Sequence, residues 1–413
     1  MLIMSLLLFF TTIKKLGIIN SISLVITYLL IFDSAAFSFT SFNIRVWYIL
    51  LIPLVGYYFC INISFTKKID SVFTLCIFSL LGLMITYLFI DPKDGKLSII
   101  KYLLFSIGLI YVLYKSFLKI IKKGYKTQLF SFFISLGLFV ASWGIIQYLT
   151  WNTPLHQKFQ YDWFNMRPSA FFSETTWYSE YILFSLVFLF YRFIKKSTIK
   201  DGFGIFICLI GIILSSTRNT YLAIFVWVFV ALVISIMDNR VNKKVLLSLF
   251  ITCILFFILI RFTDLGMFFD KIIERFKGGD NGRMTAVKRS LNDISKSPII
   301  GHGFSFNGEY EGAGTYVGAK NFNFFFMCLH TIGLVGFNFL IILLLSYGIK
   351  CIMQYLKFRR DEAKIAVIFI SCFLSISMFA PMHQSFIGMF VIAMSIALYN
   401  SVTIKQIVDI EIL

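Results

Sequence analysis

Three arginines stand in segments between long apolar runs, and their chemistry suggests a shared role. They are Arg167 in MRPSAFFSE, Arg218 in SSTRNTYLAIF and Arg283 in DNGRMTAVKRS. A guanidinium is a planar donor that matches two phosphate oxygens at once, so two or three converging arginines could hold a diphosphate. Arg283 also begins a predicted helix, whose N-terminus favours an anion. The alternative is that these arginines reach to lipid headgroups at the edge of a membrane.

Two glutamates are candidates for acid or base chemistry. Glu174 and Glu180 straddle the start of the apolar run at 175–194. A spacing of six residues does not place two side chains on one face of a helix. One glutamate could act as an acid or a base, and it could equally form a structural salt bridge with Arg167 or Arg218.

The histidines and cysteines show no metal-binding pattern. The seven cysteines occur singly, without a CxxC pair, which indicates packing residues and not a disulfide framework or a zinc site. The sequence has no Gly-rich phosphate loop and no acidic metal pair, which argues against an enzyme that uses nucleotides. The four histidines are scattered and lack the mutual spacing of metal ligands; they are His156, His302, His330 and His383.

The elements that must position these residues are membrane spans. Hydrophobic residues make up 59% of the 413 residues, charged residues make up 14%, and the mean hydropathy is +0.85. A soluble chain of this length could not bury so much apolar surface. We therefore predict an all-α, polytopic membrane protein, with residues 1–413 as one domain of about twelve transmembrane helices. The predicted spans are 16–32, 46–64, 72–90, 98–114, 129–148, 175–194, 203–217, 219–237, 245–262, 322–348, 365–380 and 382–399.

Residues 1–13 form a further apolar run at the beginning of the sequence. Lys14 and Lys15 follow this run instead of preceding it, and no small-residue cleavage site comes next. A removable signal peptide is therefore not expected. We expect an interfacial or partly inserted lead-in, with a thirteenth span as the alternative.

The distribution of charge predicts how the spans are oriented. Lys and Arg total 38 against 20 Asp and Glu, a net charge of +18. With the N-terminus inside, the inner segments carry 22 Lys and Arg and the short outer segments carry six, as the positive-inside rule requires. Such an excess indicates topology and contact with anionic membrane lipids, and it argues against a nucleic-acid partner.

The long outer segment 263–321 is predicted to be a periplasmic loop subdomain with short amphipathic helices. Residues 264–277 have the apolar face of a helix that lies on the bilayer surface, and they end at Gly278-Gly279. A second helix is predicted from Arg283 to Pro298. The orientation of the spans places this subdomain, which contains Arg283, on the same outer face as Arg167 and Arg218.

Several of these segments together resemble the bacterial superfamily of O-antigen ligases and O-antigen polymerases. The similar features are the SSTRN turn that opens a helix, GR followed by an amphipathic helix and PIIGHGFS, NFNFFFMCLHTIGLVG, and RPSAFFSE. The resemblance covers about residues 160–350. It implies a membrane fold of the GT-C type with a large late periplasmic loop, which agrees with the predicted spans.

The resemblance implies transfer of a glycan from undecaprenyl diphosphate at the periplasmic face, without a nucleotide sugar, a cofactor or a metal. Phe322 stands where the family has the histidine of a His-Asn pair, so the base stays open between the other acidic and histidine candidates and a phosphate oxygen of the donor. Arg218 and Arg283 match the family's donor-binding arginines. We expect catalytic roles for Arg218, Arg283, His330 and Glu174, and substrate binding by Arg167, Asn323, His302 and Glu180.

These inferences predict a glycosyltransferase of the bacterial inner membrane that polymerises lipid-linked oligosaccharide repeat units of an O-antigen or capsule. The missing histidine favours a polymerase over a ligase that transfers the glycan to lipid A-core. A flippase is the alternative of another class, but the predicted spans carry little charge beyond Lys101 and Glu180. The expected partners are the undecaprenyl diphosphate-linked donor, a glycan or lipid acceptor, membrane lipids and a chain-length regulator.

Overall fold

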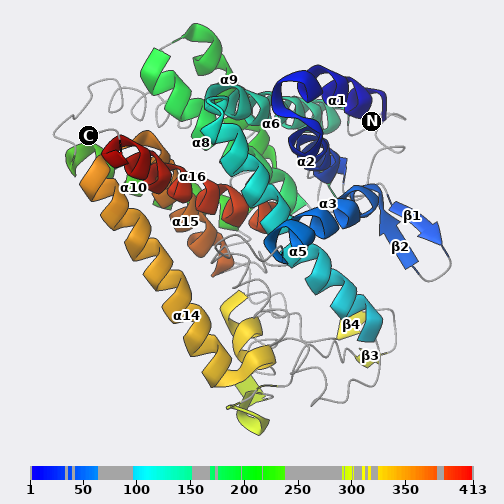
Figure 1. Ribbon diagram of the computed structural model, residues 1–413. Helices are drawn as coiled ribbons and strands as arrows, with labels where there is room; N and C mark the ends of the chain where they lie inside the picture. The colour runs from blue at the N-terminus through cyan, green and yellow to red at the C-terminus, as the bar shows by residue number, and fades with distance from the viewer. Residues whose placement is uncertain are drawn as a thin grey trace, which may run out of the picture.

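A computed structural model shows the chain as a bundle of helices (Figure 1). Nearly all of the described residues are helical, which confirms the predicted all-α class. The structure describes residues 2–32, 36–39, 42–63, 96–150, 168–172, 175–196, 198–215, 217–237, 291–292, 294–299, 301, 309–311, 315–317, 324–378 and 386–411.

The helices follow the predicted apolar segments closely. Ten of the twelve predicted segments coincide with described helices, while the segments at 72–90 and 245–262 lie outside the described residues. The helices are α1 (Leu2–Leu16), α2 (Ile18–Leu29) with the short helix η1 (Leu30–Phe32), α3 (Val46–Ile63), α5 (Lys96–Lys122), α6 (Lys126–Leu149), α8 (Thr175–Lys196), α9 (Ile199–Ser215), α10 (Arg218–Met237), α14 (Phe324–Phe358), α15 (Asp361–Ser377) and α16 (Phe386–Glu411).

Two small antiparallel hairpins, which the sequence did not predict, accompany the helices. Strands β1 (Ala36–Phe39) and β2 (Phe42–Arg45) lie between η1 and α3. Strands β3 (Glu309–Glu311) and β4 (Thr315–Val317) belong to the segment 263–321. The predicted helix that ends at Pro298 is present in its last turns, at 291–292 and 294–296, whereas the predicted helix at 264–277 lies outside the described residues.

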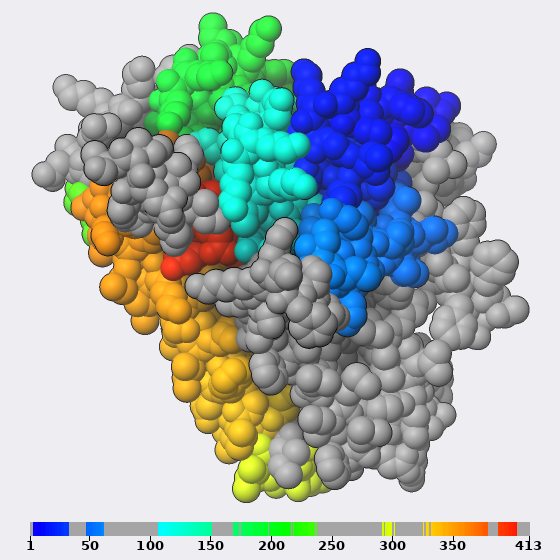
Figure 2. Space-filling model, viewed as in Figure 1, coloured from blue at the N-terminus to red at the C-terminus, as the bar shows by residue number. Residues whose placement is uncertain are grey.

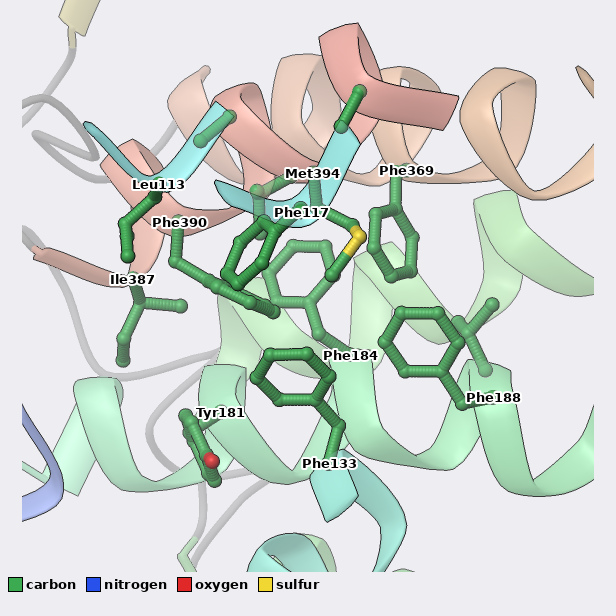
Figure 3. Packing of buried hydrophobic residues seen from close by; sticks show 14 of the residues in the cluster. Leu113, Phe117, Phe133, Tyr181, Phe184, Phe188, Phe369, Ile387, Phe390 and Met394 are labelled. Carbon is green, nitrogen blue, oxygen red and sulfur yellow. The ribbon is translucent and has the colours of Figure 1, made fainter. Parts of the chain in front are cut away.

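Aromatic side chains fill the centre of the bundle, where α5, α15 and α16 face α6 and α8 (Figure 3). Phe133 of α6 packs against Phe117 of α5, with ring centroids 5.7 Å apart, and against Phe390 of α16 at 4.7 Å. Phe188 of α8 stacks on Phe133 at 5.8 Å and meets Phe369 of α15 edge-on at 5.0 Å. These contacts explain part of the high phenylalanine content, since each ring joins two or three helices at once.

Two of the described helices are long and apolar enough to cross a membrane, namely α6 and the Ile332–Phe358 part of α14. Helix α14 runs along the edge of the bundle (Figures 1 and 2) and exposes a row of large apolar side chains, among them Val335, Phe339 and Ile342. An exposed apolar face of this size suits contact with lipid. The predicted number of twelve spans stays a prediction.

The first apolar run forms the 15-residue helix α1, which exposes Ile3, Leu6 and Phe10. Helix α1 is shorter than the roughly 20 residues that a span usually needs, but α9, which coincides with a predicted span, has only 17 residues. The lead-in and the thirteenth span both stay predictions. Gly17 separates α1 from α2 and has a φ of 85°, a left-handed conformation that glycine adopts without steric cost.

Charged side chains tie helix ends together at one end of the bundle, here called the basic end. Lys126 at the start of α6 binds Glu362 at the start of α15, with 2.6 Å between Nζ and Oε1. Lys195 at the end of α8 binds Asp361, also at the start of α15. Helices α6 and α15 therefore begin at the basic end, and α8 ends there.

Two further contacts extend the basic end to other helices. Arg192 of α8 donates hydrogen bonds of 3.0 and 2.6 Å to the carboxylate of Asp201, which lies in the first turn of α9. The ammonium of Lys123 donates to the carbonyl of Leu16 at the end of α1, at 3.1 Å. The helix directions agree with the predicted alternation of inner and outer segments.

The two carboxyls at the start of α15 have lowered pKa values. Burial raises the pKa of Asp361, but hydrogen bonds from Lys195 and Tyr191 outweigh it, so the pKa lies below its ordinary value. Burial likewise raises the pKa of Glu362, and the hydrogen bond and charge of Lys126 outweigh it. Both groups are therefore carboxylates at neutral pH.

We predict that Glu362→Gln lowers the Tm of the purified protein at pH 7. The cost should be about 1 kcal/mol, as for a partly buried ion pair. Because the folded-state pKa of Glu362 is lowered, its contribution is complete above the unfolded value of about 4.3. It is lost as the pH falls through the lowered folded-state pKa.

Thermal unfolding at pH 7 and at pH 3 checks this prediction. The difference between Glu362→Gln and the unaltered protein should shrink at pH 3. The control is Lys196→Gln, at an exposed position near the same ion pairs. It should leave the Tm unchanged at both pH values. An equal loss at both values would show that the ionised carboxylate is not the source of the stability.

Candidate functional site

The described parts of the RPSAFFSE and SSTRN segments lie at the opposite end of the bundle, here called the motif end. Helix α6 begins at the basic end and α8 ends there, so the end of α6 at Leu149 and the start of α8 at Thr175 lie at the motif end. Helix α9 begins near Arg192, which places its last residue, Ser215, at the motif end as well.

The SSTRN segment is a tight turn stabilised by its own hydroxyl groups. The Ser215 hydroxyl donates to the carbonyl of Ile212 at 2.6 Å, and the Thr217 hydroxyl donates to the Ser215 hydroxyl at 3.0 Å. Both side chains are buried. Arg218 is the first residue of α10, so this helix begins one residue before the predicted span at 219–237, and the side chain of Arg218 lies outside what the structure describes.

A hydrogen bond between two buried hydroxyls joins the starts of α8 and α10. The Oγ of Ser179 lies 2.7 Å from the Oγ1 of Thr220, which is two residues after Arg218. The next residue on α8 is Glu180, whose side chain is 1% exposed. A buried carboxyl is stable when it is protonated or paired with a cation. The structure thus brings Glu180 and Arg218 to adjacent helix starts.

The RPSAFFSE segment forms a buried turn against α6. The side-chain oxygen of Gln147 accepts hydrogen bonds from the backbone N–H groups of Ser169 at 3.1 Å and Ala170 at 2.8 Å. The ring of Phe171 stacks on Trp143 of α6, with centroids 5.2 Å apart. Gln147 is 5% exposed. Residues Pro168 to Phe172 are therefore held by α6 at the motif end.

Helix α14 is broken at Gly333, where the PIIG segment packs against it. Gly333 has φ 62° and ψ −174°, which interrupts the helix. The N–H of Leu334 donates to the carbonyl of Pro298 at 2.8 Å, and that of Val335 donates to Ile299 at 3.3 Å. A Cβ at Gly333 would lie 2.2 Å from the Ile299 oxygen. Only glycine fits this approach, because both the positive φ and the contact exclude a side chain.

The carbonyls of Pro298 and Ile299 satisfy N–H groups that would otherwise lack partners at the restarted helix. Ser297 completes the arrangement, since its hydroxyl donates to the Gly301 carbonyl at 2.8 Å and its own carbonyl accepts from the Gly301 N–H at 3.0 Å. Two motifs that are far apart in the sequence, PIIG and GLVG, are thus one backbone-bonded unit.

The remaining candidate residues are placed only in part. His330 lies in α14, three residues before Gly333, and its side chain lies outside what the structure describes. His302 directly follows Gly301 in the chain. Arg167, Glu174, Arg283, His302 and Asn323 all lie outside the described residues. The assignment of all eight candidate residues, which include Arg218 and Glu180, to catalysis and substrate binding stays a prediction.

Sequence reasoning missed two residues that shape the motif end, namely Gln147 and Gly333. Gln147 directly follows the apolar stretch GLFVASWGII, near the end of the predicted span 129–148. A polar residue at such a position is a signal for a buried hydrogen-bond acceptor. Gly333 lies in the segment NFNFFFMCLHTIGLVG, whose resemblance to the superfamily gives no reason for glycine at this position. Among the described residues, no group of three His, Cys, Asp or Glu could hold a metal ion.

Comparison with known proteins finds one family. A family model described as O-antigen ligase matches residues 203–341. No curated protein and no solved structure matches the chain. The match runs from α9 into α14, and it includes the SSTRN turn and the unit formed by PIIG and GLVG. It confirms the resemblance to the superfamily of O-antigen ligases and polymerases, which are membrane-integral, glycosyltransferase-like enzymes.

We predict that Gly333→Ala releases the 297–301 segment from α14. The positive φ costs about 1 kcal/mol or more for alanine, and the new Cβ collides with the Ile299 carbonyl. Trypsin should therefore cleave after Lys296 several-fold faster than in the unaltered protein. Gly333→Asn should behave in the same way, because asparagine tolerates a positive φ but still carries a Cβ.

The matched control is Gly348→Ala, on the same helix. A Cβ at Gly348 would meet its nearest side-chain atom, Cγ2 of Ile370, at an ordinary 3.9 Å, so cleavage should not change. If Gly333→Asn retained the slow cleavage of the unaltered protein, backbone strain and not the close approach of Ile299 would explain the glycine.

Proposed function

We propose that this protein is a membrane glycosyltransferase that polymerises undecaprenyl diphosphate-linked oligosaccharide repeat units at the periplasmic face of the inner membrane. The observation that carries the proposal is the match of residues 203–341 to the O-antigen ligase family. This match contains Arg218 and Arg283, the two arginines with the chemistry for a diphosphate. The described parts of RPSAFFSE and SSTRN lie at the same end of the bundle, which supports the proposal.

The proposed reaction asks the protein mainly for orientation and charge stabilisation. The bond between the anomeric carbon and the diphosphate oxygen breaks, and a new bond forms to a hydroxyl oxygen of the acceptor glycan. Undecaprenyl diphosphate leaves with the bonding electrons, and the guanidinium groups of Arg218 and Arg283 neutralise the charge that develops on it. Arg167 adds a third guanidinium on the same side.

The proton of the acceptor hydroxyl needs a destination. The candidate bases are His330, Glu174, His302 and Glu180, or a phosphate oxygen of the departing diphosphate. Glu180 has the best-defined surroundings, because it is buried beside the Ser179–Thr220 hydrogen bond that joins α8 to α10. Asn323 is proposed to orient the acceptor or the donor, since its amide both donates and accepts hydrogen bonds.

A ligase that transfers the glycan to lipid A-core is the second candidate within the family. Phe322 occupies the position at which the family has a histidine, and a phenyl ring cannot accept a proton. This difference favours the polymerase. A flippase is the candidate of another class, and the concentration of arginines near one end of the spans is less suited to a pathway across the membrane.

Deleting the gene and comparing the length ladder of the surface glycan tests the proposed function. A polymerase predicts that glycans with a single repeat unit remain. Complete loss of polymer from the lipid A-core would instead indicate a ligase. Loss of all repeat units from the outer surface, with lipid-linked units accumulating inside, would indicate a flippase.

We predict that Arg218→Ala and Arg283→Ala each reduce glycan polymerisation by about 100-fold or more, while expression and membrane insertion stay normal. Arg218→Lys and Arg283→Lys should rescue poorly, because lysine keeps the charge but loses the two-nitrogen fork. Glycan ladders from cells with each variant provide the measurement. Normal ladders from both lysine variants would exclude the bidentate contact, and normal ladders from both alanine variants would exclude these residues from the site.

We also predict that residues 263–321 are periplasmic and that the loop near Lys122 is cytoplasmic, as the distribution of Lys and Arg requires. With the outer membrane permeabilised, a cysteine replacing Gly312 should react with a membrane-impermeant thiol reagent, above the background of the native cysteines. A cysteine replacing Lys122 is the control and should react only after the inner membrane is opened. The reverse pattern would place the three arginines on the wrong side for the proposed reaction.

A further inference from the structure

We propose that Gln147 is a positioning residue for the glycan transfer, because its side-chain oxygen fixes the turn of residues 168–172 at the motif end. This inference rests on the proposed function and adds a residue that the sequence motifs did not contain. Gln147 lies in the last turn of α6, which ends at Leu149. The turn that it holds directly follows Arg167 in the chain and comes shortly before α8.

The contact between Gln147 and the turn is short, double and buried. One side-chain oxygen accepts from two successive N–H groups, those of Ser169 at 3.1 Å and Ala170 at 2.8 Å. Ser169 and Ala170 are 1% and 5% exposed, so water is not a ready substitute for the lost acceptor. Leaving two buried N–H groups without a partner would cost more than the net gain of forming the bonds.

The conformation of the turn explains why it needs this support. Ala170 has a φ of 49°, a left-handed conformation that is unfavourable for a residue with a Cβ. Such a conformation persists when surrounding contacts determine it. The two hydrogen bonds that the Gln147 oxygen accepts, from the N–H groups of Ser169 and Ala170, hold the backbone of the turn. The hydrogen bond from the N–H of Phe172 to the Ser169 carbonyl, at 2.9 Å, closes the turn.

Aromatic contacts fix the next residue of the turn and so define its orientation. The ring of Phe171 stacks on Phe139 with centroids 5.5 Å apart and an angle of 13°, and on Trp143 at 5.2 Å and 21°. Phe32 of η1 lies against the same ring at 4.7 Å. Helix α6 thus presents Phe139, Trp143 and Gln147 at spacings of four residues, which places all three on one face.

The position of the turn links it to the reaction. It is continuous on one side with Arg167 and leads on the other side to α8, whose Ser179 binds Thr220 beside Arg218. A displacement of about 1 Å in a catalytic group can reduce a rate about 100-fold. Loosening the turn should therefore impair the transition state for transfer more than it impairs folding or donor binding.

Four variants of the full-length protein test this inference, assayed in detergent with an undecaprenyl diphosphate-linked oligosaccharide as the donor. Gln147→Leu removes the acceptor and Gln147→Asn draws it back by one methylene, so both should reduce kcat by about tenfold or more with a smaller change in KM. Gln147→Glu keeps an oxygen at the same reach and should stay within about threefold of the unaltered protein.

The matched control is Gln354→Leu. Gln354 is also a buried glutamine, and it donates to the carbonyl of Tyr399 at 3.0 Å near the basic end. Its loss should lower the Tm about as much as Gln147→Leu but leave kcat unchanged. A kcat for Gln147→Leu equal to that of the unaltered protein, an equal loss in Gln354→Leu, or no rescue by Gln147→Glu would each overturn the proposal.

A second readout separates this inference from the proposed function. Ser169→Cys should be protected from a thiol reagent in the presence of Gln147, and it should react at least several-fold faster when combined with Gln147→Leu. If the unaltered protein elongated no lipid-linked glycan, the proposed function would fail. The labelling result would still decide whether Gln147 holds the turn, and equal labelling in both backgrounds would show that it does not.

Discussion

The need of buried backbone groups for hydrogen-bond partners is the constraint on which the motif end depends. In apolar surroundings a backbone N–H without a partner is costly, so a turn or a broken helix is stable there only if other parts of the chain supply acceptors. The side-chain oxygen of Gln147 supplies one acceptor for the 168–172 turn, and the carbonyls of Pro298 and Ile299 supply two for α14. Irregular backbone can therefore persist at the motif end.

The two ends of the bundle are stabilised by different means. The basic end uses ion pairs between helix ends, such as Lys126 with Glu362, which suit a surface in contact with water and anionic lipid. The motif end uses buried hydroxyl, amide and backbone groups, such as Ser179 with Thr220. Among the described residues, the ion pairs lie at the basic end.

The sequence predicted the helices well and the contacts between motifs poorly. Apolar runs locate helices because a helix satisfies its own backbone, and α10 begins at Arg218, one residue before the predicted span at 219–237. The hydrogen bonds from the Ser169 N–H to Gln147 and from the Leu334 N–H to Pro298 join residues that are 22 and 36 positions apart. No local pattern encodes such pairs. Glycine is needed at position 333 because the carbonyl of Ile299 lies against it, and the sequence does not reveal this contact.

Reconstitution of the purified protein tests the central claim of polymerisation most directly. The protein would be incubated in detergent or vesicles with undecaprenyl diphosphate-linked repeat units as the sole glycan, without nucleotide sugars. The account predicts a ladder of longer lipid-linked glycans together with stoichiometric release of undecaprenyl diphosphate. The account would be contradicted if the repeat units stayed single, whether or not lipid A-core was added.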